Sequence, residues 1–336
     1  MFDGLSTTVI LIIIIALFFD FVNGWNDAAN SVATVVSTKV LTPIKAVGLA
    51  AFMNFIAFLI MPHAVALTIG KGIVDISIVT PTLILSTLLA AIFWGVFMTQ
   101  FGLPISMSHT LIGGFMGAGI AAGGFQVLIM SGITKVLLFI VLAPIFGFVF
   151  SMLFSAVLFR AIRKLRPSTI NRVFGKLQLL SVSWYSLGHG ANDALKTAGI
   201  ISALLISVGY MDINADIPTW VILSAYISIG LGTLIGGWKV IRTMGMKITK
   251  LRPVDGFSAE TGGGVLLFLT SIFGIPVSTT HVIAGSIMGV GATKRATSVR
   301  WGLARTIVGA WILTIPATTF GGFVVYKAFV LLNITL

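Results

Sequence analysis

The 336-residue chain is 57% hydrophobic and 9% charged, and it contains no cysteine. Soluble domains carry about 25% charged residues, so this chain lacks the polar surface to cover itself in water and is predicted to be an integral membrane protein. The missing cysteines exclude disulfides and thiolate metal sites. The net charge of +12 is typical of membrane proteins with basic cytoplasmic loops, and we expect no nucleic-acid partner.

Apolar segments of helical length run along the whole chain, and they are too long for the strands of a membrane barrel. They fall at 5–36, 43–62, 81–101, 104–122, 133–159, 177–209, 217–238, 260–273, 276–292 and 306–332. This pattern predicts an all-α integral membrane protein with about 10–12 membrane helices.

Basic residues gather between these segments. Four blocks stand out, near 39–45, 160–176, 239–252 and 294–305. If all four blocks face the cytoplasm, the crossings place both termini outside, and Lys71, Lys135 and Lys327 fall on the outer face. We therefore expect a multi-pass protein of the cell (inner) membrane.

Two polar strings occur twice. Residues 24–28 read Gly-Trp-Asn-Asp-Ala and return 166 positions later, at 190–194, as Gly-Ala-Asn-Asp-Ala. Residues 102–109 read Gly-Leu-Pro-Ile-Ser-Met-Ser-His and return 172 positions later, at 274–281, as Gly-Ile-Pro-Val-Ser-Thr-Thr-His. Two strings in the same order at nearly the same offset indicate an ancient duplication.

The predicted topology places the two copies of each string on segments that enter the membrane from opposite sides. The halves therefore form an inverted-topology repeat, an arrangement that recurs in secondary transporters with sites near the midplane. We assign 1–159 to an N-terminal repeat, 160–176 to a basic cytoplasmic linker and 177–336 to a C-terminal repeat.

The Pro-x-Ser strings predict two hairpins whose half-helices meet near the midplane. Pro104 and Pro276 suit the first turn of a new helix, and Ser106 and Ser278 can cap it. Two facing helix starts would bind an anion through their unpaired N–H groups. The candidate oxyanion ligands are Ser106, Met107, Ser108, Ser278, Thr279 and Thr280. In the alternative interpretation, the hydroxyls only satisfy the broken helix backbone.

Four other polar residues near these strings are predicted to surround the residues that contact the anion. They are Gln100, His109, His281 and Lys196. Each histidine either donates to the anion or bonds a backbone carbonyl. His63 and His189 are weaker candidates for this site, because neither has a histidine at the equivalent position of the other half.

The Asn-Asp strings place carboxylates inside apolar helices, where they are costly and usually functional. Gly24 and Gly190 are expected to loosen these helices and free backbone carbonyls. Carboxylate, amide and carbonyl oxygens suit Na⁺, although the aspartates could instead carry a proton. The candidate cation ligands are Asn26, Asp27, Asn192 and Asp193. Lys196 stands three residues after Asp193 and could pair with it; a purely structural aspartate remains the alternative.

A carboxylate beside a bound oxyanion repels it by several kcal/mol at an effective dielectric near ~20. A cation between them, or a proton on the aspartate, removes this repulsion. Binding of the anion then depends on binding of the cation, which is thermodynamic coupling.

At these residues the chain resembles the inorganic phosphate transporter (PiT) family, whose signature is a duplicated Gly-Ala-Asn-Asp string. The second copy, at 190–193, is complete. The first copy, at 24–27, has Trp25 in place of Ala, and the Ser-Thr-Lys-Val-Leu-Thr that follows it at 37–42 also matches the family. The resemblance implies import of phosphate by cation symport, most simply with Na⁺, through alternating access. It also implies a homodimer in the lipid bilayer, no covalent cofactor and no enzymatic activity. Asn54 departs from the pattern, since many relatives have Glu there.

Other functions stay open at this point. One is a proton-coupled permease for phosphate or sulfate. A passive anion channel would leave the duplicated aspartates unexplained. An intramembrane aspartyl protease with a shared proton is a remote alternative; its usual Gly-x-Gly-Asp context does not occur here.

Overall fold

The computed structural model describes residues 5–60, 72–275 and 277–334. Within these ranges the regular secondary structure is helical, and an isolated β-bridge joins Val74 and Leu128. The all-α prediction is therefore confirmed. Three residues named above, His63, Lys71 and Pro276, lie outside the described residues.

The described residues of the first half form five α-helices and two short 3₁₀ turns. These are α1 (Thr7–Ser37), α2 (Pro43–Ile60), η1 (Ile76–Ile78), α4 (Pro81–Gln100), α5 (Met107–Gly123), η2 (Phe125–Val127) and α6 (Met130–Ile162). The second half has a similar order, but among its described residues it has one more α-helix, and a π-helix in place of the first 3₁₀ turn. It contains α7 (Pro167–Ser207), α8 (Thr219–Ile235), α9 (Trp238–Arg242), the π-helix η3 (Thr243–Lys247), α10 (Pro253–Ile272), α11 (Thr279–Lys294), η4 (Ala296–Ser298) and α12 (Trp301–Leu331).

Several helices can cross a bilayer by length and composition. Among the described residues these are α1, α2, α4, α6 and α12, and α8 together with α9 and η3 would form a sixth span bent by 65°. The bend falls at Gly236, whose φ of +69° is readily adopted only by glycine. The expectation of a multi-pass membrane protein is confirmed.

Some helix boundaries differ from those predicted. The expected linker at 160–176 is helical on both sides of a short turn at 163–166, since α6 continues to Ile162 and α7 begins at Pro167. Proline pre-forms the first turn of α7, and the basic residues that follow are good helix formers. Hydropathy alone missed this part of α7 because its side chains are polar and largely exposed.

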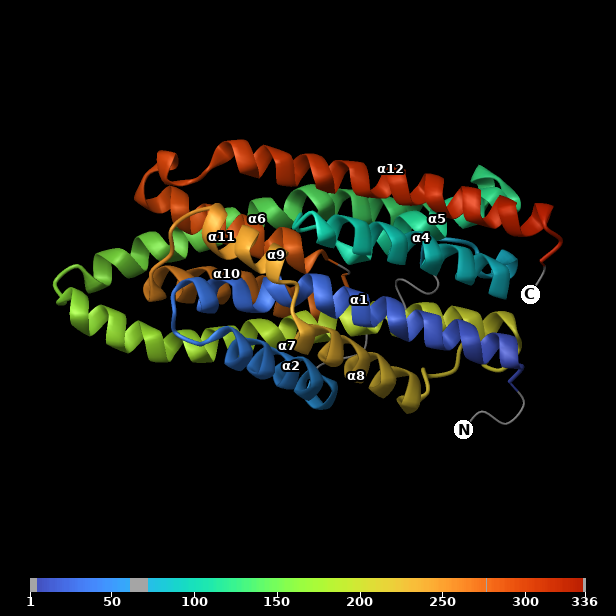
Figure 1. The fold of residues 1–336 in the computed structure, drawn as a ribbon, viewed down its shortest axis with the longest axis horizontal. Coiled ribbons are helices and arrows are strands. Elements are labelled where there is room, and N and C mark those ends of the chain that lie inside the picture. The colour runs from blue at the N-terminus through green and yellow to red at the C-terminus, as the bar shows by residue number, and fades with distance from the viewer. Residues whose placement is uncertain (1–4, 61–71, 276, 335–336) are drawn as a thin grey trace.

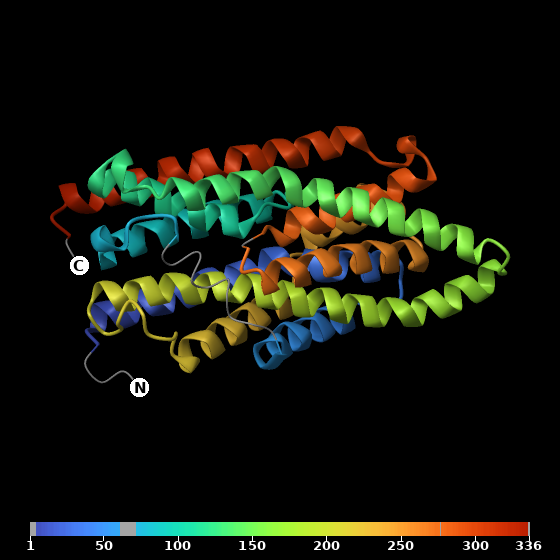
Figure 2. The same cartoon turned by 180° about the vertical axis from the view of Figure 1, so that it is seen from behind.

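The helices form one long bundle, with both termini at one end and the α6–α7 turn at the other (Figures 1 and 2). Helix α1 runs from the terminal end and α7 runs back toward it, and other corresponding helices of the two halves also run in opposite directions (Figure 1). The halves exchange partners: α1 packs on α8 and α7 on α2, while α5 packs on α12 and α11 on α6.

Glycines allow the contacts between α5 and α12 and between α11 and α6 to be very close. A Cβ atom on Gly285 would lie 2.2 Å from the carbonyl oxygen of Pro144, and one on Gly117 would lie 1.9 Å from that of Thr319. No side chain fits at such distances, so these helix pairs touch backbone to backbone.

The half-helices begin at the serines of the Pro-x-Ser strings, as predicted, but Pro104 lies before α5 rather than in its first turn. Ser106 caps α5 and accepts a hydrogen bond from the His109 backbone N–H at 3.3 Å. Ser278 caps α11 and accepts one from the His281 backbone N–H at 3.2 Å. The two starts meet near the middle of the bundle, where the Thr280 hydroxyl lies 3.1 Å from the carbonyl oxygen of Ile105 (Figure 1).

Candidate functional site

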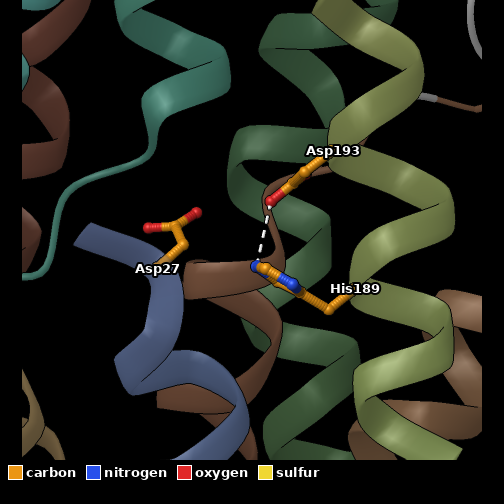
Figure 3. A group of neighbouring side chains, drawn as sticks. All are labelled: Asp27, His189 and Asp193. Carbon is orange, nitrogen blue, oxygen red and sulfur yellow. Dashed lines mark ion pairs between the residues drawn. The ribbon is translucent and has the colours of Figure 1, made fainter. Parts of the chain in front are cut away.

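Asp27 on α1 and Asp193 on α7 lie next to each other at the junction of the half-helices (Figure 3). Both are buried, with exposed fractions of 2% and 0%. A carboxylate oxygen of Asp27, a carboxylate oxygen of Asp193 and a ring nitrogen of His189 all lie within 4.8 Å of one another. The packing therefore brings together two carboxylates that are 166 positions apart in the sequence.

Both helices continue without a break through the Asn-Asp strings, so the expectation of loosened helices with free carbonyls is wrong. The glycines serve close packing instead. A Cβ atom on Gly24 would lie 2.2 Å from the carbonyl oxygen of Ile229, and one on Gly190 would lie 2.7 Å from that of Asn54. The ligand atoms available at these strings are consequently those of the side chains.

Lys196 compensates the charge of Asp193. Its ammonium group lies 2.7 Å from Asp193 Oδ1 and also donates to Ser108 Oγ at 2.6 Å and to the Val277 carbonyl oxygen at 2.7 Å. The Thr279 hydroxyl donates to the other carboxylate oxygen of Asp193 at 3.0 Å. Lys196 thus joins α7 to the starts of both half-helices.

Asp27 has a different environment. Its Oδ1 atom accepts from the Thr280 hydroxyl at 3.3 Å, and among the described residues it forms no ion pair with a basic side chain. Asn30, which stands where the second copy has Lys196, donates to Thr279 at 3.2 Å and to Thr280 at 2.9 Å. Asp27 therefore lacks the counter-charge that Asp193 has.

The two asparagines of the strings also differ. Asn26 donates to the Thr99 hydroxyl at 2.5 Å, while its Oδ1 atom has no hydrogen-bond partner in the described part of the chain. Asn192 donates to Ser271 at 3.2 Å and accepts from the Val277 backbone N–H at 3.4 Å. Asn26 can thus offer its amide oxygen to a ligand, while Asn192 holds the turn before α11.

The two histidines of the Pro-x-Ser strings contact each other across the junction. The ring centroids of His109 and His281 are 4.7 Å apart in an edge-to-face arrangement, and His281 stacks on Trp311 at 3.8 Å. His281 Nδ1 lies 3.3 Å from the carbonyl oxygen of Ile140, and Trp311 donates to that of Pro104 at 2.8 Å. This aromatic group packs the half-helix starts against α6 and α12.

Gln100 lies away from the predicted site, while Met107 is the first residue of α5, at the half-helix start. Gln100 ends α4 with an exposed side chain, and its carbonyl oxygen accepts from Lys239 at 2.9 Å, so the structure does not bring it to the aspartates. Met107 is buried, and its side chain covers Gly95.

His189 is a site residue that sequence comparison of the halves set aside. Its Nε2 atom lies 3.3 Å from Asp193 Oδ2 (Figure 3), and its Nδ1 atom lies 3.2 Å from Asn54 Oδ1. Asn54 in turn donates to Thr233 at 3.0 Å. The four-residue spacing of His189 and Asp193, one helical turn, is the signal that could have found it.

Glu260 on α10 is another buried carboxylate, and it is not among the residues predicted from the sequence. It accepts from Thr34 at 2.5 Å, from Gln178 at 2.9 Å and from the Ser181 hydroxyl. These donors come from α1 and α7. An acidic residue at the start of an apolar, glycine-rich run is the sequence signal that marks it.

The junction combines the N-terminal ends of two helices, several hydroxyls and one ammonium group with two carboxylates. Helix starts and hydroxyls favour an anion, and an uncompensated carboxylate favours a cation. A buried polar cluster of this kind, between the half-helices of a multi-pass bundle, defines a membrane transport protein.

Comparison with known proteins gives the family. The model of the "Phosphate transporter family" matches residues 23–322. The chain is 51% identical over 306 residues to a "Probable low-affinity inorganic phosphate transporter" of Rhizobium meliloti (strain 1021), covering 91% of this chain and 92% of that one. It is 42% identical over 326 residues to a Bacillus subtilis (strain 168) protein of the same name, covering 96% and 98%.

A solved structure has the same fold. "The sodium-dependent phosphate transporter" matches with a TM-score of 0.87 and 28% identity, covering 98% of this chain and 100% of that one. This chain belongs to the phosphate transporter family. It is a transporter and not an enzyme, as the sequence predicted.

Proposed function

We propose that this protein imports inorganic phosphate across the cell membrane by symport with Na⁺ through alternating access. The observation that carries the proposal is the position of Asp27: a buried carboxylate without an ion-pair partner among the described residues, bonded to the first turn of α11. Phosphate at the helix starts and a bare carboxylate at Asp27 would repel each other. A cation bound between them stabilises both.

Phosphate would be held by the donors at the two helix starts. The Ser108, Thr279 and Thr280 hydroxyls lie there, together with the Lys196 ammonium group. A tetrahedral oxyanion accepts hydrogen bonds in every direction and so can use donors from both half-helices. The Ser106 and Ser278 side chains cap the helices and orient the N–H groups that follow them.

Na⁺ would be held by Asp27 and the free amide oxygen of Asn26. Both are hard oxygen ligands, and two unit charges at ~4 Å interact by about 4 kcal/mol at an effective dielectric near ~20. This is enough to make phosphate affinity depend strongly on the cation. The name of the structural relative, which describes that protein as sodium-dependent, supports Na⁺ as the coupling ion.

Alternating access would use the two halves, 1–159 and 177–336, as moving units joined by 160–176. Corresponding helices run in opposite directions, and each half contributes one half-helix to the junction (Figure 1). This supports an inverted repeat around a fixed site. Both termini share the end of the bundle opposite the basic α6–α7 turn, which supports termini outside the cell.

Proton coupling is the second candidate, and one observation favours it. Lys196 already compensates Asp193, so a single proton on Asp27 would neutralise the remaining carboxylate. In that case phosphate binding would be steep in pH and indifferent to Na⁺.

Uptake of labelled phosphate into proteoliposomes separates the candidates. An inward Na⁺ gradient at equal pH should accelerate uptake, and an inward proton gradient without Na⁺ should not. Uptake driven only by the proton gradient would overturn Na⁺ coupling, and uptake indifferent to both gradients would overturn symport. Asp27→Asn should abolish acceleration by Na⁺.

We also propose a homodimer, as the resemblance implies. Each chain contains both half-helix starts and both aspartates, so each protomer would hold a complete site. Multi-angle light scattering of the purified protein should give the mass of two chains. A mass of one chain at every detergent concentration tested would contradict the dimer.

A further inference from the structure

A second polar cluster lies on α1, seven residues before Asp27 and hence about 10 Å nearer the terminal end of the bundle. Its centre is Asp20, which is 0% exposed. Asn23 Nδ2 donates to Asp20 Oδ1 at 3.3 Å. The Thr197 side chain of α7 and the Tyr226 side chain of α8 both lie close enough to interact with the Asp20 carboxylate.

Each of these four side chains has a buried oxygen atom without a hydrogen-bond partner among the described residues. The atoms are Asp20 Oδ2, Asn23 Oδ1, Thr197 Oγ1 and Tyr226 Oη. A buried polar atom is costly to leave unpaired, and four around one carboxylate indicate that something binds between them.

The described part of the chain supplies no ion-pair partner for Asp20. The nearby Lys196 is held by Asp193, Ser108 and the Val277 carbonyl oxygen. A carboxylate buried within a membrane protein needs a cation or a proton. The unpaired Asn23 carbonyl oxygen and the two hydroxyls favour a cation, because each can direct a lone pair toward it.

We propose that Asp20, Asn23 and Thr197 form a second Na⁺ site, with the Tyr226 hydroxyl at its edge. All candidate ligands are hard oxygen atoms, and three helices provide them, so the site is closed when the helices pack. The proposal rests on the proposed function only for the identity of the cation.

The site draws on both halves of the molecule, but it is not duplicated. At the repeat offset of 166, Asp20 corresponds to Ser186 and Asn23 to His189, so α7 has no second copy. The ion would therefore serve the pathway on the terminal side of the phosphate junction only. From there its charge would also reduce the repulsion between phosphate and Asp27, since about 10 Å of protein interior screens it weakly.

Equilibrium binding of radiolabelled Na⁺ to the purified full-length protein, without phosphate, tests the proposal. Asp20→Asn should bind one Na⁺ fewer than wild type, and Asp27→Asn should retain this ion. Thr197→Val and Tyr226→Phe preserve shape and should weaken its binding severalfold. Ser202→Ala is the matched control on α7: its buried hydroxyl already donates to the Ala198 carbonyl oxygen of its own helix, so this variant should bind Na⁺ as the wild type does.

Unchanged Na⁺ binding by Asp20→Asn at every Na⁺ concentration and pH would overturn the second site and leave Asp20 as a protonated structural residue. If Asp20→Asn does not fold, wild-type binding by both Thr197→Val and Tyr226→Phe would overturn it. A different result would contradict the proposed Na⁺ symport. In that case phosphate binding by the wild-type protein would not depend on Na⁺, whatever the effect of Asp20→Asn on Na⁺ binding.

Discussion

At the scale of single residues, two aspartates in equivalent positions have different partners. Asp193 has Lys196 three residues later, and Asp27 has the neutral Asn30 there. The two carboxylates share one buried junction, but among the described residues only Asp193 has a basic ion-pair partner. One sequence position per half thus determines which carboxylate has an ion-pair partner, and this difference underlies the proposal of a cation at Asp27.

Charge removal should therefore act differently at the two positions. Asp193→Asn leaves the Lys196 ammonium buried without its partner, which costs about 3–5 kcal/mol of stability. Asp27→Asn removes an uncompensated charge and should leave the unfolding temperature unchanged or raise it, while phosphate binding loses its dependence on Na⁺. Thermal unfolding and equilibrium phosphate binding at two Na⁺ concentrations measure both effects.

The double variant Asp193→Asn with Lys196→Met provides the control, because it removes both charges and should recover most of the lost stability. Equal destabilisation by the two single variants would contradict the assigned asymmetry.

The hydroxyl at Thr279 is expected to matter for phosphate affinity. Thr279→Val removes the bond to Asp193 Oδ2 and an acceptor for Asn30. It also removes the hydrogen bond that Thr279 is proposed to donate to phosphate. Loss of that bond, worth about 1.4 kcal/mol, should raise the apparent KM for phosphate roughly tenfold. Ser155→Ala is the control, since that buried hydroxyl bonds the Ser151 carbonyl oxygen within α6. Similar KM values for both variants would mean that Thr279 is structural.

At the scale of elements, the half-helices α5 and α11 are held by helices of the opposite half. Each begins at a serine cap and packs along glycines, so its start is placed by backbone contacts rather than by flexible side chains. This keeps the N–H groups of both starts directed at the junction.

A methyl group at such a contact should separate the helices. Gly285→Ala places a Cβ atom 2.2 Å from the Pro144 carbonyl oxygen, and the overpacking should cost about 1–3 kcal/mol of stability. It should also weaken phosphate binding, because α11 moves. Gly309→Ala on α12 is the matched control, since nothing lies within 4 Å of its new Cβ atom. Unfolding temperatures equal for both variants would contradict the packing role.

At the scale of the whole molecule, the helices form a bundle with two distinct ends. The termini lie at one end and the basic turn between α6 and α7 at the other (Figure 2). Arginine and lysine near a membrane end favour the cytoplasm, so the ends are expected to face opposite sides of the membrane.

Cysteine labelling tests this orientation, and the natural chain has no cysteine to interfere. Lys327→Cys should react with an impermeant thiol reagent on intact cells. Arg166→Cys should react only after permeabilisation. Both positions are exposed, so a failure to react reports the side of the membrane. Labelling of both from the same side would contradict the proposed topology.

The sequence by itself determined the features that depend on local composition and spacing. Hydropathy predicted an all-α membrane protein, and the duplicated strings identified Asp27, Asp193 and the half-helix starts at Ser106 and Ser278. Lys196 was recognisable as a partner of Asp193 because residues three apart share a helix face. These inferences need no knowledge of which helices pack together.

Only the tertiary structure decided contacts between distant segments. Thr280 reaches Asp27 across 253 residues, and Thr34 reaches Glu260 across 226. The glycines of the Asn-Asp strings, expected to loosen helices, instead admit the backbone of neighbouring helices. The physical reason is the same in each case: a local pattern shows that a group is small or polar, but packing determines which atoms of other helices it meets.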